Sequence, residues 1–104
     1  MEAQNKNSGK IKVYTVLDSV DGEKLKGIKI NLYRINGVSP SLEESKYTDE
    51  NGYVEFTSIP DGNYRIIEII DKRKFLKPSY RKWNEVNISK ALREAEIFII
   101  NKIR

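Results

Sequence analysis

The sequence contains no cysteine and no histidine among its 104 residues. Without cysteine the chain cannot form a disulfide framework, a zinc finger or a thiol nucleophile. Without histidine it lacks the commonest general base and metal ligand, so its many hydroxyl groups have no obvious activating partner. We therefore predict a protein that is not an enzyme, with no catalytic residues, no metal site and no cofactor.

Long hydrophobic runs are also missing. No stretch of the chain reaches the roughly 18 consecutive apolar residues that a membrane-spanning helix requires, and residues 2–10 are too polar to be a signal peptide. Apolar residues make up 38% of the chain, which is enough for one modest core and too many for a disordered polypeptide. We expect a flexible N-terminal segment over residues 1–9 and a single domain over residues 10–104.

Period-two alternation of apolar and polar residues dominates the chain and predicts β-strands. Expected strands cover residues 11–16, 28–33, 46–48, 54–56, 64–70, 83–88 and 97–103. Residues 36–45 are expected to form a loop, and residues 89–94 a turn or one helical turn. Six or seven short strands separated by turn signals indicate an all-β fold, an antiparallel sandwich. The side chains expected in its core are Ile11, Val13, Ile30, Leu32, Val54, Phe56, Tyr64, Ile66, Ile97 and Ile99.

Acidic and amide side chains gather in two of the expected turns. These are Asp18, Asp21, Asp49 and Asn51. Their oxygens are possible calcium ligands, but no complete calcium-loop spacing is present. We interpret these residues as turn formers, because Asp and Asn hydrogen-bond to nearby backbone and tolerate unusual φ angles.

The net charge of +4 comes from one stretch of the chain. Residues 71–83 contain six basic groups and one acidic group, a local net charge of +5. The candidate residues for binding a polyanion or a partner are Lys72, Arg73, Lys74, Lys77, Arg81, Lys82 and Trp83. Basic side chains interleaved with aromatic ones are typical of polyanion-binding surfaces. The alternative is a solvated loop that Phe75, Leu76 and Trp83 anchor to the core.

Several motifs occur in a characteristic order. Residues 9–13 and 18–27 give an opening strand and a turn of the form D-x-x-x-G-x-x-L-x-G, and residues 28–33 give the following strand. The most specific motif is TDENGYVEFTSIPDGNY at residues 48–64. Together these motifs resemble the prealbumin-like, Cna-B-type domains of Gram-positive surface adhesins and pilins, the B domains of collagen-binding proteins among them. The resemblance covers residues 9–103.

The resemblance implies a cross-link that this sequence lacks the means to form. In many such domains a lysine on the first strand condenses with an asparagine on the last strand, assisted by a glutamate. Glu68 and Asn101 match the acid and amide positions, while Thr15 or Val16 stands where the lysine is expected. Lys12 lies on the strand face opposite Ile11 and Val13. We therefore expect no isopeptide bond and predict that Glu68, Asn101 and Thr15 form a buried hydrogen-bonded group.

The resemblance also implies a function and a location. We expect a structural or stalk module of a bacterial cell-surface protein that spaces or displays an adhesive region. Its signal peptide and wall anchor would lie outside this chain. The expected partners are neighbouring domains of the same protein, with a host matrix or cell-wall polyanion as a further candidate. We expect a monomer that does not bind nucleic acid. The alternative function is a binding module that uses the basic, aromatic loop at residues 72–83.

Overall fold

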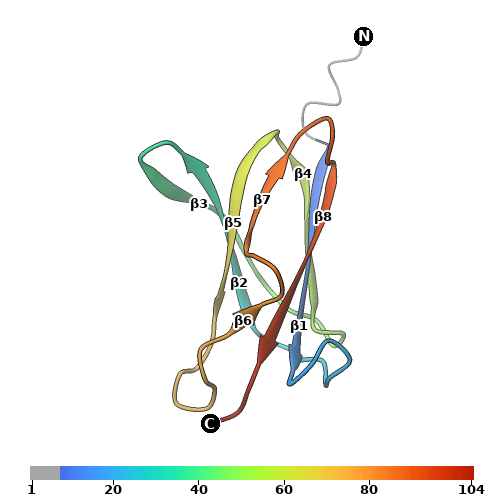
Figure 1. Ribbon diagram of the computed structural model, residues 1–104, viewed down its shortest axis with the longest axis vertical. Helices are drawn as coiled ribbons and strands as arrows, with labels where there is room; N and C mark the ends of the chain where they lie inside the picture. The colour runs from blue at the N-terminus through green and yellow to red at the C-terminus, as the bar shows by residue number, and fades with distance from the viewer. Residues whose placement is uncertain (1–7) are drawn as a thin grey trace.

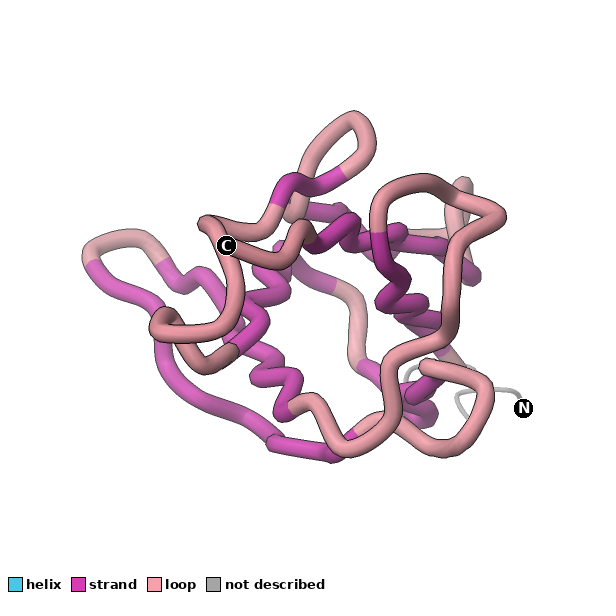
Figure 2. Tube along the Cα trace, turned by 90° about the horizontal axis from the view of Figure 1, so that it is seen from below, coloured by secondary structure: helices cyan, strands magenta, loops and turns pink. Residues whose placement is uncertain are grey.

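A computed structural model describes residues 8–104, which form eight β-strands in two sheets (Figure 1). The strands are β1 (Gly9–Leu17), β2 (Lys29–Asn36), β3 (Ser39–Tyr47), β4 (Tyr53–Ile59), β5 (Gly62–Ile69), β6 (Ser79–Tyr80), β7 (Glu85–Ile88) and β8 (Glu94–Asn101). The first sheet has the order β4-β1-β8-β6 and the second the order β3-β2-β5-β7. Figure 2 shows the two sheets facing each other. This confirms the predicted all-β sandwich, with eight strands instead of six or seven.

One strand pair departs from the antiparallel pattern. β1 and β8 run parallel, in register from Lys10 opposite Glu94 to Leu17 opposite Asn101. The other strand pairs are antiparallel. Because β1 and β8 point the same way, the chain enters at one end of the sandwich and leaves β8 at the other (Figure 1).

The prediction of a loop at residues 36–45 is wrong, because most of this segment belongs to β3. Asn36 and Ser39 pair across a two-residue connection in which Gly37 has a φ of 75°. This positive φ suits glycine and the tight turn of a hairpin. β3 is exposed along most of its length, so its side chains show no alternation between buried and exposed positions. Pairing with β2, rather than burial, makes this segment a strand (Figure 1).

The predicted core is confirmed. All ten residues expected inside the sandwich belong to the buried apolar cluster, which also includes Ile59, Ile88 and Ala95. Residues 89–93 form the expected turn, closed by reciprocal backbone hydrogen bonds between Ser89 and Leu92, and Glu94 already begins β8. The turn interpretation of Asp49 also agrees with the structure, since its carboxylate accepts hydrogen bonds from the Asn51 and Tyr53 amides.

The anchoring role considered for Trp83 is wrong. Trp83 is 70% exposed and lies outside β7, which begins at Glu85. Tyr80 packs against the core, and its hydroxyl accepts a hydrogen bond from the Glu68 amide at 2.9 Å. This bond ties β6 in the first sheet to β5 in the second.

The structure also bears on the predicted N-terminal boundary of the domain and on the predicted lack of a membrane-spanning helix. β1 begins at Gly9, and residues 1–7 of the expected flexible segment lie outside the described residues. Within residues 8–104, no helix is long and apolar enough to cross a membrane.

Candidate functional site

The structure brings Thr15, Glu68 and Asn101 together inside the sandwich. Thr15 lies on β1 and Asn101 ends β8, both in the first sheet, whereas Glu68 lies on β5 in the second. Their exposed fractions are 0%, 0% and 5%, respectively. We call these three residues the buried polar cluster.

Short hydrogen bonds join the members of the buried polar cluster. The Thr15 hydroxyl donates to Glu68 Oε1 at 2.6 Å, and Asn101 Nδ2 donates to Thr15 Oγ1 at 2.7 Å. Asn101 Nδ2 also lies 3.3 Å from Glu68 Oε1 and 3.2 Å from the Val16 carbonyl oxygen. The cluster therefore links the two sheets through side chains, at a point where no backbone ladder joins them.

Local backbone contacts place Thr15 and Asn101. The Thr15 amide donates to the Gly52 carbonyl at 2.8 Å, and the Asn101 carbonyl accepts from Asp18 at 2.8 Å. Gly52 has a φ of 66°, and a Cβ there would lie 2.5 Å from the Thr15 carbonyl oxygen. The turn at residues 49–52 therefore requires glycine, both for its conformation and for its close approach to β1.

Burial sets the protonation of Glu68. Burial disfavours the charged carboxylate and raises the pKa of Glu68, while the hydrogen bonds from Thr15 and Asn101 partly oppose this shift. Two buried atoms of the cluster, Glu68 Oε2 and Asn101 Oδ1, have no hydrogen-bond partner among the described residues. Both are acceptors when Glu68 is ionised. A proton on Oε2 would turn one of them into a donor, which favours the neutral acid.

The cluster contains a hydroxyl, a carboxyl and a carboxamide, but no amine. Lys12 lies on the outer face of β1, where its Nζ is 3.3 Å from Glu94 Oε1. The contact with Glu94 raises the pKa of Lys12 and so holds it as a cation. An amine must be neutral to attack an amide, so Lys12 has neither the position nor the protonation state for the condensation. The absence of a cross-link remains a prediction.

The structure divides the basic residues between two hollows. Lys72 and Lys77 line a cavity of about 720 Å³ beside β5. Arg81 and Lys82 line a smaller one of about 270 Å³, together with Glu96 and Phe98. The remaining candidates, Arg73, Lys74 and Trp83, are exposed and line neither hollow.

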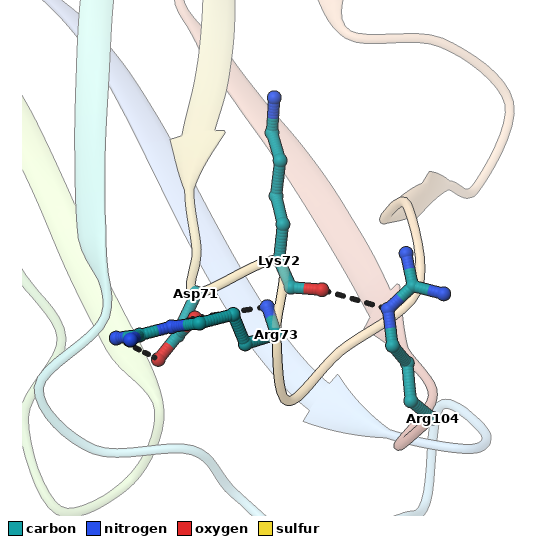
Figure 3. Close-up of polar contacts among 4 residues, drawn as sticks. All are labelled: Asp71, Lys72, Arg73 and Arg104. Atoms are coloured by element: carbon teal, nitrogen blue, oxygen red, sulfur yellow. Dashed lines mark hydrogen bonds and ion pairs between the residues drawn. The ribbon is translucent and has the colours of Figure 1, made fainter.

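Sequence reasoning missed Arg104, which also lines the larger cavity. Its Nε donates to the Lys72 carbonyl at 2.7 Å (Figure 3). Its amide donates to the Lys74 carbonyl at 2.9 Å. In the same loop Asp71 pairs with Arg73, whose Nε lies 3.2 Å from Asp71 Oδ1. Arg104 and Lys72 are 32 positions apart, and no short-range signal in the sequence joins them.

The fold and the buried polar cluster define a prealbumin-like sandwich that keeps an acid and an amide between its sheets. The SpaA prealbumin-like fold domain family matches residues 9–102, and the chain belongs to this family. The resemblance to Cna-B-type domains is thereby confirmed. A comparison with curated proteins found no match.

Solved structures with the same fold include several pilins. The chain is 25% identical to BcpA, the major pilin subunit of Bacillus cereus, with a TM-score of 0.67 over 94% of this chain and 31% of that one. It is 12% identical to the major pilin SpaD of Corynebacterium diphtheriae, with a TM-score of 0.69 over 98% of this chain and 32% of that one. It is 19% identical to GBS52, the minor pilin of Streptococcus agalactiae, with a TM-score of 0.63 over 94% of this chain and 45% of that one. The chain thus spans less than half the length of each of these pilins.

Proposed function

We propose that this chain is a non-catalytic, load-bearing module of a Gram-positive cell-surface protein, where it spaces or displays an adhesive region. The parallel pairing of β1 and β8 carries the proposal. These strands adjoin the two ends of the described chain and are in register over eight residue pairs. The similarity to pilin domains supports the surface location and the presence of neighbouring domains.

The geometry of β1 and β8 suits a module under tension. The chain enters β1 at one end of a body measuring 51 × 29 × 21 Å and leaves β8 at the other (Figure 1). A force between the two ends then acts along both strands in opposite directions. It loads the hydrogen bonds between them at the same time, rather than breaking them one after another.

Single-molecule pulling in two directions tests this proposal. One attachment pair uses an N-terminal tag and a cysteine added after Arg104, which shears β1 against β8. The other uses the same tag and Ala91→Cys, which peels the strands apart from one end, because Ala91 is exposed in the turn before β8. The chain has no cysteine of its own, so each attachment is unique. We expect a higher unfolding force in shear. An equal or lower force in shear would contradict the proposal.

The surface location needs its own test. Antibodies raised against the folded domain should label intact cells of the bacterium that encodes it. Labelling only after the cells are permeabilised would contradict the proposed location and leave the mechanical result unaffected.

A further inference from the structure

We propose that the 720 Å³ cavity beside β5 binds a short, extended peptide segment that carries carboxylates and apolar side chains, and that this peptide pairs with the open edge of β5. The cavity lies within the range of roughly 300–1,000 Å³ that is typical of ligand sites. This inference goes beyond the proposed load-bearing function and does not depend on it.

The edge of β5 is open at its C-terminal end. β7 pairs with β5 only from Gly62 to Arg65, and Asn84 extends the contact by one residue, to Ile66. Beyond this point β2 still pairs with the opposite edge as far as Ile69. Residues 67–70 of this open edge line the cavity.

Backbone groups at this edge face the cavity side. The amides of Ile66 and Glu68 bond to Asn84 and to Tyr80, so both point away from β2. Strand alternation directs the Ile70 amide the same way. Within residues 8–104 the Ile70 amide has no acceptor. An added strand would supply one, as in other complexes where a peptide extends a sheet.

The charges around the cavity are complementary to an acidic ligand. Its basic lining residues are Lys72, Lys77 and Arg104. Among residues 8–104, the one acidic lining residue is Glu68, whose Oε1 accepts hydrogen bonds from Thr15 and Asn101 on the core side of β5. A ligand carboxylate at this site therefore lies near three cations, and Glu68 is directed into the core. Charge-assisted hydrogen bonds to such groups are among the stronger polar contacts.

Several apolar side chains in and beside the cavity are exposed to solvent. Ile69 is 48% exposed and Leu76 is 41% exposed, and both line it. Ile103 is 62% exposed and pairs with Phe75, which also lines the cavity. A peptide with alternating acidic and apolar residues could place its carboxylates on the basic groups and its apolar side chains on this surface. This combination favours a peptide over a purely charged polymer.

The test measures binding of a fluorescein-labelled peptide of alternating glutamate and valine, about five residues or ~17 Å long when extended. Fluorescence polarisation gives the affinity, and hydrogen exchange followed by NMR reports on the Ile70 amide. We expect saturable binding that weakens with salt and slows exchange at Ile70. N-methylation of the peptide amides that face β5 should weaken binding about tenfold or more, since it removes backbone donors and leaves the charges.

Charge-reversal variants locate the site. Lys72→Glu with Lys77→Glu should weaken binding about tenfold or more. The matched control is Lys26→Glu with Lys90→Glu, which makes the same change of charge at exposed lysines outside the cavity and should have a much smaller effect. All four positions are exposed, so thermal unfolding should show that both variants still fold.

Several outcomes would overturn the inference. They are an absence of saturable binding, unchanged exchange at Ile70, equal weakening by both charge-reversal variants, and tolerance of N-methylation. A parallel titration with laurate distinguishes another occupant. Binding of laurate without binding of the peptide would show a site for small amphipathic anions and overturn the peptide assignment.

Discussion

The buried polar cluster and the basic loop at residues 71–83 both concentrate polar groups, but they use them in opposite ways. The cluster joins three residues from distant parts of the chain, each at most 5% exposed. In the loop, Arg73 has a side chain that is 91% exposed and pairs with Asp71, two residues away. Buried polar groups must satisfy one another and so fix the arrangement of the sheets. Exposed charges contribute little to stability and remain available to partners.

The two acids in these regions show the same contrast. Burial raises the pKa of Glu68, whereas hydrogen bonds from Arg73 lower the pKa of Asp71. Burial therefore favours the protonated form of Glu68, whereas the contact with Arg73 favours the ionised form of Asp71. The difference arises because Glu68 is buried among neutral donors, whereas Asp71 is solvated and its hydrogen-bond donor, Arg73, is a cation.

The largest expected effect comes from removing the polar group of Glu68. Glu68→Leu leaves Thr15 and Asn101 without their shared acceptor inside the core, and we expect a loss of about 1–3 kcal/mol in the free energy of unfolding. Urea denaturation measures this loss. Glu68→Gln is the matched control and should be mild, because its amide can still accept from Thr15. A Leu variant as stable as the Gln variant would show that the cluster does not stabilise the fold.

A smaller effect should appear in the pH dependence. The pKa of Glu68 is higher in the folded protein than in the unfolded chain, where it is about 4.3. The folded state therefore binds this proton more tightly. The stability that this proton contributes is fully present below the unfolded pKa and is lost as the pH rises through the folded pKa. From pH 4 towards neutrality, the wild-type protein should lose stability relative to Glu68→Gln. Urea midpoints of both proteins across this range test the shift, and a constant difference would contradict it.

Substitution in the loop should have little effect on stability. Arg73→Ala removes the ion pair with Asp71, but both groups are solvated and the pair is local. We expect the urea midpoint to remain unchanged within error. A clear drop would mean that the loop stabilises the fold and would weaken the contrast with the buried polar cluster.

The last prediction is that no isopeptide bond forms, so the mass of the protein should not change. Since the cluster lacks an amine, the intact mass of the purified protein should equal the mass calculated from its sequence. A mass lower by one ammonia, or a peptide linked through lysine and asparagine after digestion, would show that a lysine reaches Asn101.

The resemblance to the family identified the three members of the buried polar cluster, and alternation in the sequence placed Glu68 and Asn101 on the inner faces of their strands. Glu68 follows Tyr64 and Ile66 on the inner face of β5, and Asn101 follows Ile97 and Ile99 on β8. Their mutual hydrogen bonds depend on how the two sheets pack, which no local pattern specifies.

The features that were missed lack such a pattern. β3 is exposed on both faces, so only its turn at Asn36 and Gly37 marked it as half of a hairpin. Trp83 is large and apolar, yet nothing in its spacing distinguished a buried position from the exposed one it has. The contact of Arg104 with the basic loop depends on the path of the chain after β8, which the sequence does not reveal.

The position of β8 has a consequence for the order in which the domain can fold during synthesis. β8 is the last of the eight strands described in residues 8–104, yet it lies inside the first sheet, between β1 and β6. Until it emerges, β1 lacks its parallel partner, and Thr15 and Glu68 lack Asn101. Long-range pairings of this kind close large loops and form late. A growing chain therefore cannot complete this fold before β8 has emerged, and the first sheet stays open until then.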